Sequence, residues 1–113
     1  MGILENIDAT IDSYGKSAGT QDIAGLRVLQ TRLSVLSSSL GSMVGVCYEQ
    51  MEHARVERMQ KGSKGDKYYV NEAQTKADYK MLELKRTQVN HILNAMTVCI
   101  NSLSKEYTRS YNQ

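Results

Sequence analysis

The residues best suited to chemistry are a cluster of cations beside two tyrosines near the middle of the chain. The cluster begins at His53, and between Ala54 and Tyr69 only two carboxylates oppose five Lys and Arg side chains, which gives a local formal charge of +3. Lysine and arginine neutralise phosphates, and tyrosine rings stack on unpaired bases. The cluster therefore predicts a binding site for single-stranded nucleic acid, formed by Arg55, Arg58, Lys61, Lys64, Lys67, Tyr68 and Tyr69.

The same residues are also typical of a solvated turn. Lysines keep an exposed turn soluble, and Tyr68 or Tyr69 can pack on the helix that follows. The sequence leaves both interpretations open.

No residue pattern indicates an enzyme. His53 and His91 are far apart in the sequence, and no Ser, Cys or carboxylate stands in a motif that either histidine could activate. Two Cys and two His also lack the paired short spacings of a zinc site. We therefore predict a non-enzymatic protein with no catalytic residues, no metal and no cofactor.

Composition and charge narrow the class of protein. With 113 residues and no Trp, Phe or Pro, the chain predicts one domain whose core is built from Leu, Ile, Val, Met, Ala and some Tyr. The net charge of +2 is too small to indicate nucleic acid by itself. Residues 1–50 hold three basic and five acidic side chains, whereas residues 51–113 hold 11 and seven, so an anionic partner is expected to meet the second half.

Cysteine usage and the N-terminus bear on location. In a hairpin folded near Lys64, the thiols of Cys47 and Cys99 would lie about 27 Å apart, which no disulfide spans. We expect both cysteines to be reduced and to be buried as small apolar side chains, as is typical of a protein in a reducing compartment. The first residues lack a basic region and a long apolar core, so we expect no signal peptide. The expected location is cytoplasmic, with no membrane contact.

Two long proline-free segments must position the cluster. Residues 20–61 and 70–109 carry heptad-like apolar spacing and flank a turn at 62–69 that contains Gly62 and Gly65. We predict an all-α fold, a long antiparallel, coiled-coil-like helical hairpin forming a single domain over residues 1–113. Thr20 or Asp22 can cap the first long helix.

A short helix is expected before the hairpin. Ile3, Leu4, Ile7 and Ile11 follow spacings of three and four, which predicts a helix over residues 2–14 and a linker over 15–19. This helix would serve either as a lid on the hairpin or as an arm exchanged between subunits.

The apolar residues outnumber what one hairpin seam can bury. Valines such as Val28 and Val35, with Leu84 and Val98, widen the stripes beyond the a and d positions. Two uncharged stretches, residues 33–48 and 87–104, are expected to lie side by side away from the turn. We therefore predict a homo-oligomer held by Leu33, Leu36, Leu40, Val44, Val89, Ile92, Met96, Ile100 and Leu103.

Small residues interrupt the first of these stretches. Five serines with Gly41 and Gly45 would let helix backbones approach closely, or alternatively mark a weak or bent piece of helix.

The layout resembles one known family. A helix ending in Ala54-Arg55 and Arg58, a Gly-Ser-Lys-Gly-Asp turn at 62–66, and an amphipathic helix through Ile92, Ala95 and Leu103 resemble phage recombination mediator proteins of the UvsY type. Members are small, helical, ring-forming proteins that bind single-stranded DNA and help to load a recombinase. The resemblance implies that Arg55, Arg58, Lys61 and Lys64 face DNA, and that the C-terminal helix drives oligomerisation. If the chain is phage-encoded, the expected cytoplasm is that of a bacterial host.

Two functions follow as hypotheses. The first is a non-enzymatic, oligomeric accessory protein that binds single-stranded DNA at its basic turn, with a recombinase or another protein as a further partner. The alternative is a helical adaptor that binds protein only, such as a phage structural or assembly factor or an inhibitor of a host protein.

Overall fold

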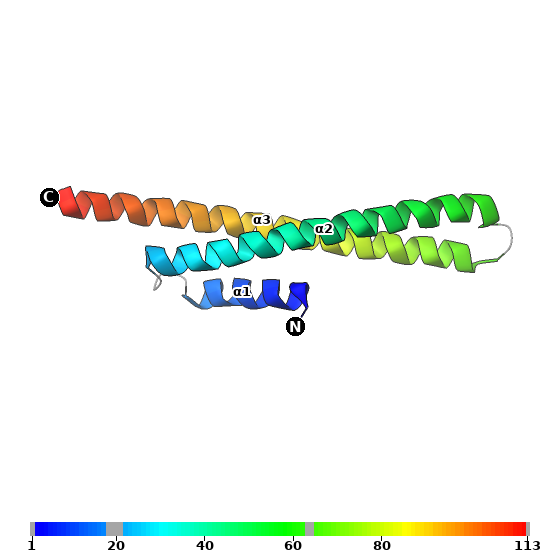
Figure 1. The fold of residues 1–113 in the computed structure, drawn as a ribbon, viewed down its shortest axis with the longest axis horizontal. Helices are drawn as coiled ribbons and strands as arrows, with labels where there is room; N and C mark the ends of the chain where they lie inside the picture. The colour runs from blue at the N-terminus through cyan, green and yellow to red at the C-terminus, as the bar shows by residue number, and fades with distance from the viewer. Residues whose placement is uncertain (1, 18–21, 63–64, 113) are drawn as a thin grey trace. The chain divides into compact units, whose positions relative to one another are not determined.

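The computed structural model describes residues 2–17, 22–62 and 65–112, and the side chains up to residue 106. These residues form three helices, α1 (Ile3–Ser17), α2 (Ile23–Lys61) and α3 (Lys67–Asn112), and none of them is in a strand (Figure 1). Helices α2 and α3 pack as a hairpin, which confirms the predicted all-α architecture.

The first helix is longer than predicted. It runs through Gly15 to Ser17, where the expected linker should have begun. A glycine inside a helix costs only about 1 kcal/mol relative to alanine, and a salt bridge of 3.0 Å between Lys16 and Asp12 lies in the last turn. Helix α2 begins at Ile23 rather than at the predicted residue 20. Of the two predicted caps, Thr20 falls outside the described residues, and the Asp22 carboxylate accepts a hydrogen bond of 2.7 Å from the Gly25 backbone N–H.

The turn is shorter than predicted, because α3 begins at Lys67 rather than at residue 70. The backbone N–H of Val70 donates a hydrogen bond of 3.0 Å to the Asp66 carbonyl, which closes the first turn of α3. Just before it, Gly65 adopts φ +145°, a conformation that residues with a side chain rarely take. Tyr68 and Tyr69 therefore belong to the helix and not to the turn.

The chain divides into two compact units. Unit 1 comprises Met1–Ser39 with Gln88–Gln113, and unit 2 comprises Leu40–Thr87. In unit 1, α1 lies along α2 (Figure 1), and its Ile7 and Thr10 are buried. The Thr10 hydroxyl donates to the Asn6 carbonyl at 2.8 Å, so burial leaves it satisfied. Within one chain α1 thus takes the position of a lid.

The core of unit 1 lies between α1, α2 and α3. Apart from Ile7, its buried apolar residues are Leu26, Leu29, Leu33, Val89, Met96 and Ile100. The Gln30 side-chain amide also donates a hydrogen bond of 2.8 Å to the Thr97 hydroxyl, which joins α2 to α3.

The described residues of unit 2 belong to two helices, α2 and α3. Its buried apolar residues are Leu40, Val44, Ala54 and Leu82. The rings of Tyr48 and Tyr79 meet between the helices, with centroids 5.6 Å apart and planes tilted by 57°.

The residues predicted to hold an oligomer contribute mostly to these cores. Six of the nine are buried within one chain, namely Leu33, Leu40, Val44, Val89, Met96 and Ile100. The other three, Leu36, Ile92 and Leu103, are half-buried. The association itself stays a prediction, but the six buried side chains have little surface left for a second chain.

A different set of large apolar side chains is open to solvent. It comprises Val28, Val35, Val46, Tyr48, Val56, Met59, Tyr69, Val70, Met81, Leu84 and Val98. Despite this apolar surface, no helix in the described part of the chain has both the length and the hydropathy needed to cross a membrane.

Candidate nucleic-acid interface

Unit 2 brings most of the predicted binding residues to one end of the hairpin. Arg55, Arg58 and Lys61 lie in the last two turns of α2, and Lys67, Tyr68 and Tyr69 lie in the first turn of α3. Lys64 falls outside the described residues.

Arg58 binds a carboxylate on the opposite helix. Its Nε donates to one oxygen of Glu72, and its Nη2 donates to the other at 3.3 Å, so a bidentate pair joins α2 to α3. This hydrogen bonding raises the pKa of Arg58 and lowers the pKa of Glu72. The guanidinium also lies 5.6 Å from the centroid of the Tyr69 ring. A phosphate would have to displace a carboxylate already in place.

Arg55 has a carboxylate partner as well. Its Nη2 donates to Glu52 at 2.9 Å and its Nε donates to the same oxygen at 3.2 Å, and these contacts raise the pKa of Arg55. A third nitrogen, Nη1, lies 3.4 Å from the Met59 sulfur.

These two pairs change the charge of the interface. Glu52 and Glu72 lie outside the stretch from Ala54 to Tyr69, so the sequence count did not include them. Adding these two carboxylates to the count gives five cations and four anions, so the formal charge falls from +3 to +1. The helical spacing of three residues between Glu52 and Arg55 was a signal for one of these pairs. The other pair requires the register of the hairpin.

Among the described cations of the cluster, Lys61 and Lys67 remain accessible to a ligand. Both are exposed, and neither has a carboxylate within ion-pair distance in the described part of the chain. The ammonium of Lys67 lies 5.1 Å from the centroid of the Tyr68 ring.

The two tyrosines are partly engaged. Tyr68 is half-buried, and the Lys67 ammonium lies over its ring. Tyr69 is 53% exposed, yet its hydroxyl end approaches Gly62 so closely that a Cβ there would lie 3.1 Å from the oxygen. The rings can offer a ligand only the surface that these contacts leave open.

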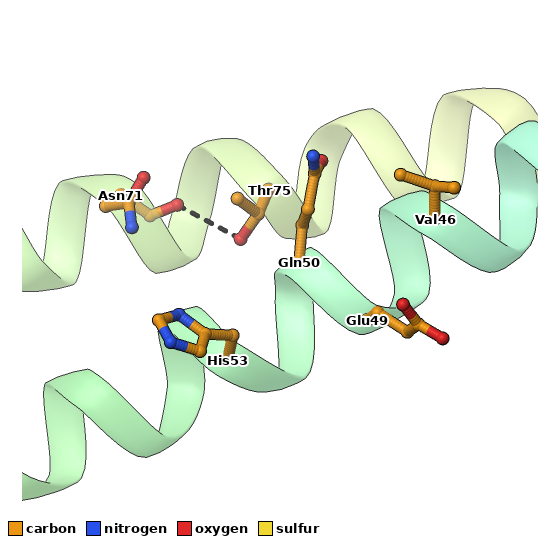
Figure 2. A pocket seen from close by; sticks show the side chains of 6 residues that line it. All are labelled: Val46, Glu49, Gln50, His53, Asn71 and Thr75. Atoms are coloured by element: carbon orange, nitrogen blue, oxygen red, sulfur yellow. Dashed lines mark hydrogen bonds between the residues drawn. The ribbon is translucent and has the colours of Figure 1, made fainter.

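An open groove of about 670 Å³ lies between the two helices of unit 2, and no sequence pattern predicted it. It is lined by Val46, Glu49, Gln50, His53, Asn71 and Thr75. In Figure 2, Gln50 reaches from α2 toward α3, where Thr75 donates its hydroxyl to the Asn71 carbonyl at 3.1 Å. His53 belongs to this groove, with Nδ1 3.8 Å from a Glu57 oxygen. The groove offers hydrogen-bonding groups.

The described residues contain no group of three or more His, Cys, Asp or Glu side chains placed to hold a metal ion. Cys47 and Cys99 are free thiols, each half-buried.

Comparison with known proteins identifies no relative. The chain matches no protein family, no curated protein and no solved structure. The resemblance to recombination mediators stays a prediction.

Proposed function

We propose that this chain is a non-enzymatic helical assembly module, whose copies associate through the uncharged outer faces of its helices. The observation that carries the proposal is the exposed apolar surface, in which Val35 is 63% and Leu84 is 73% exposed. Extended apolar surface on a small helical protein is typical of a protein-binding face.

The state of the basic turn supports this order of preference. Because Arg55 and Arg58 are paired with carboxylates, the turn has less free positive charge than its sequence suggests. A phosphate that bound either arginine would have to displace its carboxylate partner, whereas association through the helix faces requires no such displacement.

Light scattering over a range of chain concentrations tests the proposal. We expect a mass above the 12.7 kDa of one chain, falling toward it on dilution. A mass of one chain at every concentration would contradict the proposal.

Binding of single-stranded nucleic acid is a second candidate, favoured by one observation. Lys61 and Lys67 are exposed cations close to Tyr68 and Tyr69. A role as a recombination mediator requires this binding.

Fluorescence anisotropy with a labelled single-stranded oligonucleotide tests the second candidate. We expect binding that weakens steeply with added salt and is lost when Lys61 and Lys67 are both changed to alanine. The matched control changes Lys76 and Lys80, two exposed lysines of α3, and should bind nearly as wild type does. No binding at low salt would reject this candidate.

A further inference from the structure

A hollow of about 310 Å³ lies between α1 and α2 in unit 1. Its lining residues are Asn6, Ala9, Thr10 and Ser13 from α1, and Arg32 and Leu36 from α2. Pockets that bind small molecules have volumes of about 300–1,000 Å³. The hollow is therefore large enough for a small ligand.

Three of the lining side chains are hydrogen-bond donors without a partner. The guanidinium of Arg32, the amide of Asn6 and the hydroxyl of Ser13 have no hydrogen bond or ion pair with another residue in the described part of the chain. The Thr10 hydroxyl differs, because it already donates to the Asn6 carbonyl at 2.8 Å. Arg32 and Ser13 are exposed and Asn6 is half-buried, so their N–H and O–H groups are accessible to a ligand.

Among the described residues, no carboxylate lines the hollow. Helix α2 has no acidic residue between Ile23 and Tyr48. Helix α1 carries three carboxylates, all exposed and outside the lining, and one of them forms a salt bridge of 3.0 Å with Lys16; they are Glu5, Asp8 and Asp12. An arginine beside uncharged donors, with no carboxylate among them, favours an anionic ligand.

We propose that this hollow binds the phosphate group of a small organic phosphate through Arg32, Asn6 and Ser13. A phosphate group presents three acceptor oxygens, which suit a guanidinium, an amide and a hydroxyl better than the two oxygens of a carboxylate do. Ala9 and Leu36 offer apolar surface to the organic part of the ligand. Because the carboxylates elsewhere on α1 weaken the attraction, we expect a dissociation constant of about 1 mM. The binding does not depend on association between copies.

A second arginine of unit 1 provides a comparison. Arg27 is exposed as well, and it lines a hollow of about 290 Å³ between α2 and α3. In that hollow a hydrogen bond of 2.8 Å from the Gln30 amide to the Thr97 hydroxyl already joins the two helices, and Thr97 in turn donates to the Leu93 carbonyl at 3.0 Å. Two of its polar side chains are therefore already paired, and Arg27 is the matched control for Arg32.

A ligand in the hollow beside Arg32 links α1 to α2. Among its described residues, α1 buries only Ile7 and Thr10, so few contacts of its own hold it in place. A phosphate held by Asn6 and Ser13 on one side and Arg32 on the other adds contacts between the two helices. Local opening of α1 is then expected to become rarer when the ligand is bound.

Thermal unfolding of the full-length chain tests the site, followed by circular dichroism at constant ionic strength. Butyl phosphate at about 10 mM should raise the midpoint by several degrees in wild type and in Arg27→Gln, and should have no effect on Arg32→Gln. Inorganic phosphate should give a smaller rise, and butyrate none. Without ligand, the helix content and the midpoint of Arg32→Gln should match those of wild type, because Arg32 is exposed and has no partner among the described residues.

Hydrogen exchange followed by mass spectrometry gives an independent readout. In wild type, butyl phosphate at the same concentration should slow the exchange of the α1 amides up to about tenfold, and in Arg32→Gln it should not.

The contrary outcomes are distinct. No rise of the midpoint with butyl phosphate, or an equal rise in Arg32→Gln, would overturn the site. An equal rise with butyrate would overturn the assignment to a phosphate group, and an equal rise with inorganic phosphate would overturn the assignment to an organic phosphate. None of these results bears on the mass measured by light scattering, so the proposed function stands or falls separately.

Discussion

Arg58 connects three features of the structure. Its guanidinium pairs with Glu72 on the opposite helix and lies over the ring of Tyr69, whose hydroxyl end approaches Gly62. The sequence predicted that Arg58 would bind a phosphate. In the structure its guanidinium instead helps to hold the two helices of the hairpin together. Spacing along the chain could predict that Arg58 lies near the turn, but its partner 14 residues away depends on the register between helices.

The pair between Arg58 and Glu72 predicts a pH-dependent stability. Because the folded chain lowers the pKa of Glu72 below its ordinary value of 4.5, its contribution is complete above that pH and is lost as the pH falls through the lower folded pKa. We expect Glu72→Gln to lower the thermal midpoint by a few degrees at neutral pH, and the difference from wild type to vanish in acid. Circular dichroism melts at stepwise pH provide the measurement.

Glu83→Gln is the matched control for this prediction. Glu83 lies 3.8 Å from Arg86 within α3, so its removal leaves the contact between the helices intact and should have little effect at any pH. A difference between Glu72→Gln and wild type that did not change with pH would contradict the assignment.

The glycines give a second prediction at the scale of single residues. Gly45 lies within α2, and a Cβ there meets nothing within 4 Å, so Gly45→Ala should stabilise one chain by about 0.5–1 kcal/mol. Gly65→Ala should destabilise it, because φ is +145° at that position. Urea unfolding followed by circular dichroism measures both. Destabilisation by Gly45→Ala would mean that another chain packs closely at that position.

At the scale of elements, apolar spacing predicted most of the fold. The steps of three and four predicted α1 and both long helices, and these exist. The ends were less predictable, because Gly15 continues α1 and the Asp66 carbonyl starts α3 three residues early. Those ends depend on local hydrogen bonds and ion pairs, whereas the helices themselves depend on a pattern repeated over many residues.

The site was predicted less well than the fold, for a physical reason. Positions along the chain put Arg55, Arg58 and the tyrosines at the same end of the hairpin, where Arg58 lies over the ring of Tyr69. They did not show that Glu52 and Glu72 neutralise both arginines, because an ion pair depends on the facing side chains and not on the composition of one segment.

The burial pattern of α2 gives a prediction for a pair of neighbouring residues. Leu33 is fully buried in the core of unit 1, whereas Val35, two residues later, is 63% exposed. We expect Leu33→Ala to reduce the free energy of unfolding by about 2–5 kcal/mol, and Val35→Ala by at most about 0.5 kcal/mol. Urea unfolding tests both, and equal effects would mean that the faces of α2 are assigned wrongly.

At the scale of the whole molecule, the two units have small cores. Among its described apolar side chains, unit 2 buries only Leu40, Val44, Ala54 and Leu82. A core of this size contributes modest stability by itself. Covering the exposed apolar side chains of unit 2, such as Leu84, with another copy would add apolar burial where the single chain has least.

Association that buries these faces must also stabilise the fold by mass action. Anything that binds the folded chain and not the unfolded one raises the midpoint of unfolding with its concentration, and a hundredfold excess over the dissociation constant corresponds to about 2.7 kcal/mol. If each chain covered all of its apolar faces by itself, the midpoint of unfolding would not depend on chain concentration.

The most direct measurement is therefore the thermal midpoint, followed by circular dichroism, across a hundredfold range of chain concentration. Association through the helix faces predicts a midpoint that rises by several degrees with concentration, and a smaller rise for Leu84→Glu. A midpoint that is the same at every concentration would contradict the central claim that copies of this chain cover one another.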